Sequence, residues 1–144
     1  MKKIVVESTT FIAECTPTPQ QRPRFSKWGA YKSSTQKENE RLLKEALLPY
    51  KPDKPFTGAL ELLVVAHMPI PKSATKKVKE AMVKGLLPHI NKPDCSNMLK
   101  NLEDVCTQIG FWIDDRQIIK TDFTKVYSEY PSWNITINEV EFIE

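Results

Sequence analysis

The residues Lys92–Ile118, KPDCSNMLKNLEDVCTQIGFWIDDRQI, combine the clearest helical pattern of the chain with its densest group of acidic side chains. Apolar residues recur here at intervals of four, three and four, which places them on one face of a helix. They are Met98, Leu102, Val105 and Ile109. Pro93 and Asp94 open this segment and Gly110 is placed to end it. We therefore predict an amphipathic helix from Cys95 or Ser96 to Ile109.

The opposite face of this helix is polar. Positions three, four and seven residues apart share one side of a helix, and polar side chains recur at that spacing. They are Asn97, Lys100, Asn101 and Asp104. A second acidic group, Asp114 and Asp115, follows the helix. Neighbouring residues of an extended backbone point to opposite sides, so only one of these two aspartates is expected to face the polar wall.

Four segments on either side of this helix have the composition of strands. Residues 4–14 are rich in β-branched side chains, and residues 57–68 are apolar on both faces, as in a strand that is central or covered on both sides. Residues 117–127 and 133–142 complete the set. The turn Tyr130-Pro131-Ser132 between the last two predicts an antiparallel hairpin.

Two further helices are expected. Thr35 and Glu38 fit a capping box for a helix that runs to Pro49, and Ser73 begins a lysine-rich helix that Gly85 ends. The resulting order is roughly β-α-β-α-α-β-β. We predict an α+β fold, with helices packed on a mixed or antiparallel sheet and residues 1–144 forming a single domain.

The composition excludes several classes of protein. The chain has 144 residues, 40% hydrophobic and 27% charged, which indicates one globular domain. No apolar run approaches the length of a membrane span and no signal sequence opens the chain, so a cytoplasmic location without membrane contact is expected. Three cysteines without CxxC spacing argue against a disulfide framework and a structural zinc site.

Positive charge is concentrated in two segments. Residues 20–44 contain seven Lys or Arg against two acidic residues, and residues 70–92 contain six lysines against one glutamate. The loop Arg22–Lys32 also interleaves cations with three aromatic residues, a composition able to bind phosphates and stack on bases. Lysine-rich segments can also be ordinary solvated faces, and the loop aromatics can fold back onto the core.

Aspartates grouped around a lysine suit a divalent cation that faces a phosphate. Carboxylate-bound Mg²⁺ lowers the pKa of a bound water and neutralises charge on a phosphodiester under attack. Neither of the two histidines has a partner nearby in the sequence, so no histidine is expected to act as a base. Each part has a simpler explanation by itself: Asp94 as a helix cap, Lys100 and Asp104 as an ion pair, and the Asp114-Asp115 doublet as a polar turn.

The sequence KPDCSNMLK, preceded by QRPRF at residues 21–25 and followed by DDRQI at residues 114–118, resembles the signature of the RusA family of Holliday junction resolvases. The resemblance implies a RusA-like fold and a Mg²⁺-dependent endonuclease, with Mn²⁺ able to replace Mg²⁺. It also implies a homodimer that acts in DNA recombination and repair and resolves four-way junctions by paired, symmetric nicks. Such enzymes are often encoded by phages and prophages.

The resemblance assigns catalytic roles to Asp94, Lys100 and Asp115, with Asp94 and Asp115 as metal ligands. Ser96 stands where the family pattern has an aspartate, and hard cations prefer a carboxylate to a neutral hydroxyl. Asp104 or Asp114 could restore the missing charge, or Ser96 could hold a metal-bound water. Two alternatives remain: a branched-DNA-binding protein that has lost catalysis, and an interaction module for an acidic protein partner.

The remaining candidate residues support the metal or contact DNA. Asn97 and Gln117 are expected to fix the carboxylates that bind the metal. The candidates for DNA contact come from the two basic segments. They are Arg22, Arg24, Lys27, Trp28, Lys32, Lys76, Lys77 and Lys92.

Overall fold

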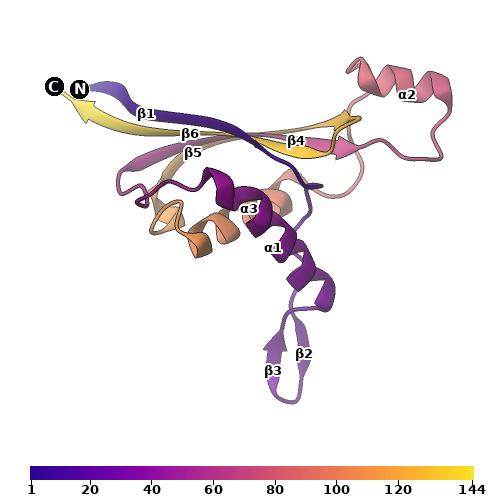
Figure 1. Cartoon of the computed structure of the whole chain (residues 1–144), viewed down its shortest axis with the longest axis horizontal. Coiled ribbons are helices and arrows are strands. Elements are labelled where there is room, and N and C mark those ends of the chain that lie inside the picture. Colours follow the sequence, from indigo (N-terminus) through magenta and orange to yellow (C-terminus); the bar gives the residue numbers. More distant parts are fainter.

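A computed structural model describes all of residues 1–144 (Figure 1). The six strands are β1 (Lys2–Ala13), β2 (Arg24–Ser26), β3 (Gly29–Tyr31), β4 (Ala59–Pro69), β5 (Ile118–Ser128) and β6 (Ser132–Ile143). The three helices are α1 (Ser34–Leu47), α2 (Lys76–Val83) and α3 (Cys95–Ile109), and short 3₁₀ turns cover Leu48–Tyr50 and Asp115–Gln117. The α+β class is confirmed.

The main sheet has the order β1-β6-β4-β5 and is mixed, because β4 pairs in parallel with β5 and antiparallel with β6. The predicted β5–β6 hairpin is therefore wrong: β4 lies between the two strands. β4 carries the longest apolar run of the chain, so its burial is greatest when a strand pairs with each of its edges. The turn after β5 crosses the end of β4 before β6 begins, and the central position predicted for this strand is confirmed.

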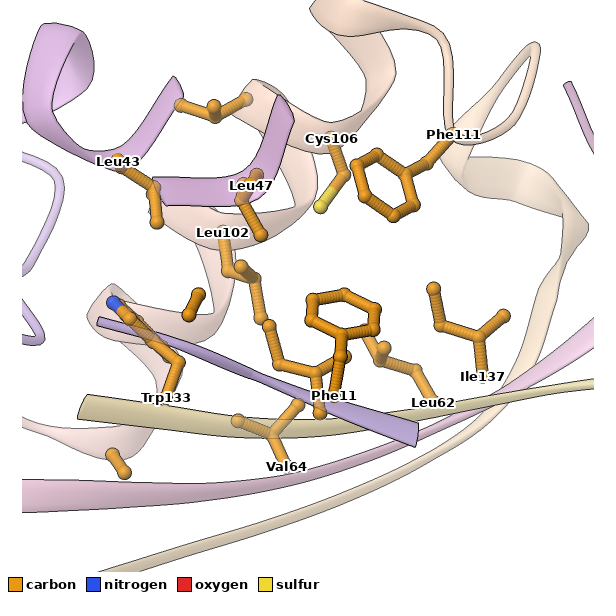
Figure 2. Close-up of a cluster of buried hydrophobic side chains, with 14 of the residues drawn as sticks. Phe11, Leu43, Leu47, Leu62, Val64, Leu102, Cys106, Phe111, Trp133 and Ile137 are labelled. Atoms are coloured by element: carbon orange, nitrogen blue, oxygen red, sulfur yellow. The ribbon is translucent and has the colours of Figure 1, made fainter. Parts of the chain in front are cut away.

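Helices α1 and α3 cover one face of the sheet (Figure 1). Figure 2 shows Leu43 and Leu47 of α1 and Leu102 and Cys106 of α3 above side chains of the sheet, all of them almost completely buried. The sheet residues labelled in this view are Phe11, Leu62, Val64, Trp133 and Ile137. Packing of this kind fixes the height and rotation of α3 above the strands, so the polar face of α3 has a defined position.

The predicted helix boundaries are close to those observed. α3 has the expected limits, and Gly110 ends it in the left-handed conformation with φ 91°. α1 starts earlier than expected, because the Ser33 hydroxyl and not that of Thr35 accepts the hydrogen bond from the backbone N–H of Gln36. Thr75, not Ser73, caps α2. No helix combines the length and hydrophobicity that crossing a bilayer requires.

The expected loop at residues 22–32 contains regular structure. Strands β2 and β3 pair as a hairpin that projects away from the sheet beyond α1 (Figure 1). The apolar periodicity of a strand is absent from these few residues, and the pairing depends on a turn at Ser26–Gly29. The aromatics of this segment do not fold back onto the core, since Phe25 and Trp28 are 78% and 86% exposed.

Candidate active site

Asp94 occupies the cap position of α3 without capping it. Its carboxylate accepts no hydrogen bond from the backbone N–H groups of the first turn and only one from Asn97 Nδ2, at 3.3 Å. The simpler explanation of Asp94 as a helix cap therefore does not hold. The carboxylate remains exposed at the positive end of the helix, with Asn97 in the contact expected for it.

Lys100 and Asp104 form an ion pair one turn apart on α3, with 3.1 Å between Nζ and Oδ1. Gln20 also donates a hydrogen bond to Asp104 from the loop before β2. The hydrogen bond to Asp104, and then the charges of Asp104, Asp115 and Glu103, raise the pKa of Lys100. Lys100 is thus a permanent cation among carboxylates and cannot serve as a base at neutral pH.

The Asp114-Asp115 doublet lies in a 3₁₀ turn between Trp112 and β5. The Asp114 carboxylate accepts a hydrogen bond from the backbone N–H of Arg116 at 2.9 Å, which lowers its pKa. Gln117 Oε1 accepts hydrogen bonds from the backbone N–H groups of Ile113 and Asp114, and its Nε2 donates to the carbonyl oxygens of Phe56 and Gly58. Gln117 therefore fixes the turn to the chain before β4, and Asp114 is occupied in shaping it.

This turn faces the C-terminal half of α3. Asp104, Asp114 and Asp115 line an open pocket of about 280 Å³ together with Thr107 and Gln108. Glu103 is half-buried next to them, and burial followed by the charge of Asp115 raises its pKa. Four acidic residues from two segments therefore share one region, with Lys100 as the cation among them.

The predicted metal ligands lie at two places along α3. Asp94 and Asp104 are ten residues apart, which is about 15 Å along a helix axis. Ser96 lies near the Asp94 end, exposed and without a hydrogen bond. No three Asp, Glu, His or Cys side chains are close enough together to form a ready-made metal site.

The donor chemistry nevertheless fits magnesium. All the candidate side chains offer oxygen atoms, and no imidazole or thiolate stands among them. Mg²⁺ in proteins is commonly held by one or two carboxylates, with water and substrate phosphates as its other ligands. Asp115 suits this open arrangement. Its carboxylate forms no ion pair with a Lys or Arg side chain and accepts no hydrogen bond from a backbone N–H group.

Three supporting residues were not predicted from the sequence. Glu103 could have been found from helical spacing, because it lies three residues after Lys100 and seven after Ser96. Gln20 gives no local signal. Lys125 of β5 gives none either, although its Nζ donates hydrogen bonds to the carbonyl oxygens of Asn91 and Pro93, at 2.6 and 2.9 Å, and so holds the segment before Asp94.

One predicted polar position has a structural role instead. Asn101 was expected on the polar wall with Lys100 and Asp104, but it is fully buried. Its Nδ2 donates to the carbonyl oxygen of Thr18, and its Oδ1 accepts from Gln36. The loop before β2 and helix α1 cover this side of α3, which the helical period alone does not reveal.

The candidate DNA-contacting residues are all exposed and lie in three places. Arg22, Arg24, Lys27 and Trp28 belong to the β2–β3 hairpin and its stem, and none of these three cations forms an ion pair. Lys32 is different, because it pairs with Glu40 at 2.9 Å. Lys76 and Lys77 begin α2, and Lys92 precedes Asp94.

Comparisons with known proteins connect the site to a family. The family model described as Endodeoxyribonuclease RusA matches residues 14–138. An uncharacterized protein of Bacillus subtilis (strain 168), YqaN, is 36% identical over 93 residues, covering 63% of this chain and 65% of that protein. A protein of Lactococcus phage r1t named crossover junction endodeoxyribonuclease rusA is 38% identical over 50 residues. That match covers 35% of this chain and 38% of the phage protein, so the aligned segments span less than two thirds of both relatives.

Proposed function

Because the chain belongs to the RusA endodeoxyribonuclease family, we propose that it is a Mg²⁺-dependent endonuclease that resolves four-way DNA junctions in recombination and repair in the cytoplasm. The observation that carries this proposal is the meeting of the Asp115 turn with α3. It gathers Asp104, Asp114 and Asp115 around one pocket, with Lys100 beside them, at the residues that match the family signature.

The chemistry proposed for the site divides among its residues. Asp115 would hold Mg²⁺ at the pocket, and Asp94 would bind Mg²⁺ at the N-terminal end of α3; the bound metal would activate water and neutralise charge on the phosphate. Lys100 places a fixed positive charge beside the phosphate and stabilises the negative charge that develops during attack. Asp104 and Gln20 hold the Lys100 side chain in place through the ion pair and the hydrogen bond behind it.

Ser96 affects how fast the proposed enzyme can cleave DNA. Its exposed hydroxyl adds no charge to the Asp94 end of the site, so fewer carboxylates are available there than in the family pattern. The second candidate is therefore a branched-DNA-binding protein of the same family with weak or no cleavage. In that case the protein binds four-way junctions but releases no nicked product in Mg²⁺ or Mn²⁺.

A cleavage assay on a synthetic four-way junction tests the main proposal. We expect paired nicks in Mg²⁺ with the wild-type protein, and loss of cleavage by at least about 100-fold with Asp115→Asn or Asp94→Asn, while junction binding is kept. Asp53→Asn is the matched control, because Asp53 is exposed in the loop before β4 and does not line the pocket. If the Asp115 and Asp94 variants cut as fast as the control, the assignment of the site is wrong.

A thermal measurement gives a readout that does not depend on cleavage. If Asp115 holds Mg²⁺, the ion raises the Tm of the wild-type protein in proportion to the logarithm of its concentration well above Kd. The same Mg²⁺ titration should give a smaller increase with Asp115→Asn and an unchanged one with Asp53→Asn. An equal increase in all three proteins would place the metal elsewhere.

A homodimer is part of the proposal, since two identical sites related by a twofold axis match the two strands to be cut. The sheet face away from α1 and α3 offers a surface for it, with Leu63 and Val65 of β4 half-buried and Ile12 of β1 49% exposed. Light scattering should then give twice the 16.6 kDa mass of one chain. The Val65→Lys variant should give a mass closer to that of a single chain.

A further inference from the structure

The β2–β3 hairpin displays two large aromatic side chains to solvent. Trp28 is 86% exposed and Phe25 78%, whereas the other two tryptophans, Trp112 and Trp133, are 1% and 0% exposed. Burying an aromatic side chain stabilises a fold by roughly 2–3 kcal/mol, so two exposed rings at one tip are not a by-product of packing. They require a different explanation.

The turn of the hairpin is built to hold Trp28 outward. The Ser26 hydroxyl accepts a hydrogen bond from the backbone N–H of Trp28 at 3.2 Å, and Gly29 follows with φ 111°, a conformation that side chains disfavour. A Cβ at Gly29 would meet no atom within 4 Å, so the glycine serves the backbone of the turn and not close packing. The local sequence therefore specifies the backbone conformation of the turn that carries Trp28.

The charge around the tip is entirely positive. No acidic residue occurs between Cys15 and Lys37, and Arg22, Arg24 and Lys27 are exposed without ion pairs. Lys27 Nζ lies 4.9 Å from the centre of the Trp28 ring. A flat aromatic surface bordered by cations matches a nucleic-acid base with its phosphates, because the ring stacks while the cations bind the backbone.

The stem of the hairpin is fixed to the candidate active site. The backbone N–H of Gln20 donates to the Asn97 carbonyl oxygen at 3.1 Å, and the Gln20 side chain donates to Asp104. On the other side of the hairpin, Lys32 pairs with Glu40 and Ser33 donates to Gln21. The eight backbone steps from Gln20 to Trp28 span at most about 27 Å, so the tip stays within about that distance of the Gln20 backbone, whose side chain contacts Asp104.

We infer that the β2–β3 hairpin is a wedge whose Trp28 stacks on the unstacked bases at the branch point of a DNA junction. Base pairs inside a duplex have both faces covered, whereas at a branch point the last pair of an arm can present an open face to a ring. The wedge therefore selects the branch, and its fixed stem sets the distance from the branch to the phosphate that is cut. This inference rests on the proposed function for its substrate.

Binding measured in EDTA, where no strand is cut, tests the wedge. We expect Trp28→Ala to weaken binding to a four-way junction about tenfold, the loss of roughly one base–aromatic stack, with little change for a linear duplex of the same length. Trp28→Phe should keep most of the junction affinity. Tyr130→Ala is the matched control, because Tyr130 is 78% exposed on the β5–β6 turn.

Tryptophan fluorescence gives an independent readout, since Trp28 is the exposed one of the three tryptophans. Adding the junction should quench wild-type emission more than adding duplex does, and Trp28→Phe should abolish the difference. The wedge is overturned if Trp28→Ala weakens junction and duplex equally, if it weakens neither, or if quenching is the same for both DNAs.

The two proposals fail separately. If the wild-type protein shows Trp28-dependent junction binding but cuts nothing in Mg²⁺, the wedge proposal stands and the nuclease proposal is wrong. If the wild-type protein cuts junctions and the Trp28→Ala variant keeps its full preference for them, the nuclease proposal stands and the wedge proposal is wrong.

Discussion

At the scale of single residues, Glu103 is the acidic residue of the candidate site whose ionisation is opposed by its surroundings. Burial and then the charge of Asp115 raise the pKa of Glu103, so its ionised form is disfavoured in the folded protein. A carboxyl group whose pKa is higher in the folded than in the unfolded protein lowers the free energy of unfolding at pH values above its unfolded pKa. At lower pH the group is protonated in both states, and this penalty vanishes. The native arrangement therefore keeps repulsive charge that a bound cation would relieve.

Replacing Glu103 by Gln should remove the cost of burying its charge and, second, the repulsion from Asp115. At pH 7 we expect Glu103→Gln to raise the Tm by up to a few degrees, and below about pH 4.5 the two proteins should unfold together. Thermal unfolding followed by circular dichroism at several pH values measures both effects. Glu129→Gln, at an exposed glutamate between β5 and β6, should leave the Tm unchanged, and a lower Tm for Glu103→Gln at pH 7 would contradict the repulsion.

At the scale of elements, the C-terminal end of α3 positions the second acidic segment. Gly110 adopts φ 91°, and the backbone N–H of Phe111 then donates to the Cys106 carbonyl oxygen at 3.0 Å. This closure turns the chain so that Phe111 and Trp112 enter the core and the aspartate doublet returns to the face of α3. Gly85 closes α2 in the same way, with φ 74°, and neither Gly85 nor any residue of α2 lines the pocket.

The two glycines make a matched pair of variants. Gly110→Ala and Gly85→Ala should each cost about 1–2 kcal/mol of unfolding free energy, since both force a side chain into the left-handed region. Only Gly110→Ala should also lower junction cleavage, because it displaces the turn that carries Asp115. Urea unfolding and cleavage of the folded variants under native conditions separate the effects. Equal cleavage by the two variants would mean that the doublet does not depend on the helix end.

At the scale of the whole molecule, a buried polar network joins α1, α3 and the stem of the hairpin. Gln36 donates to the carboxylate of Glu40 and to Asn101 Oδ1, and Lys32 pairs with Glu40 from the hairpin side. Burial by itself would raise the pKa of Glu40, but the hydrogen bonds from Gln36 and Lys32 and nearby lysine charges lower it overall. Ionised Glu40 therefore contributes to stability.

This stability should disappear in acid. The contribution of Glu40 is complete above its unfolded pKa near 4.5 and is lost as the pH falls through the lower folded value. Glu40→Gln should therefore unfold about 1–3 kcal/mol more easily than wild type at pH 7. The difference should shrink below pH 4.5 in urea unfolding. Glu45→Gln, which loses only an exposed pair with Arg41, should behave like wild type, and a pH-independent difference for Glu40→Gln would contradict this role.

Local sequence patterns predicted the three helices and the four strands of the main sheet, but not the β2–β3 hairpin, and they supplied the candidate site residues. The 4-3-4 spacing of Met98, Leu102, Val105 and Ile109 and the glycine at position 110 predicted α3 correctly, because helix period and helix ends depend on neighbours within one or two turns. The signature around Asp94 and Asp115 indicated the family in the same local way.

The folded structure is needed to see which of these elements meet. It placed β4 between β5 and β6, brought Glu103 and Asp104 to the Asp115 turn, and tied the hairpin to α3 through Gln20. These contacts join residues far apart in the chain, where no periodicity links one partner to the other. Their choice follows from how the strands and helices together bury the most apolar surface, which is a property of the complete fold.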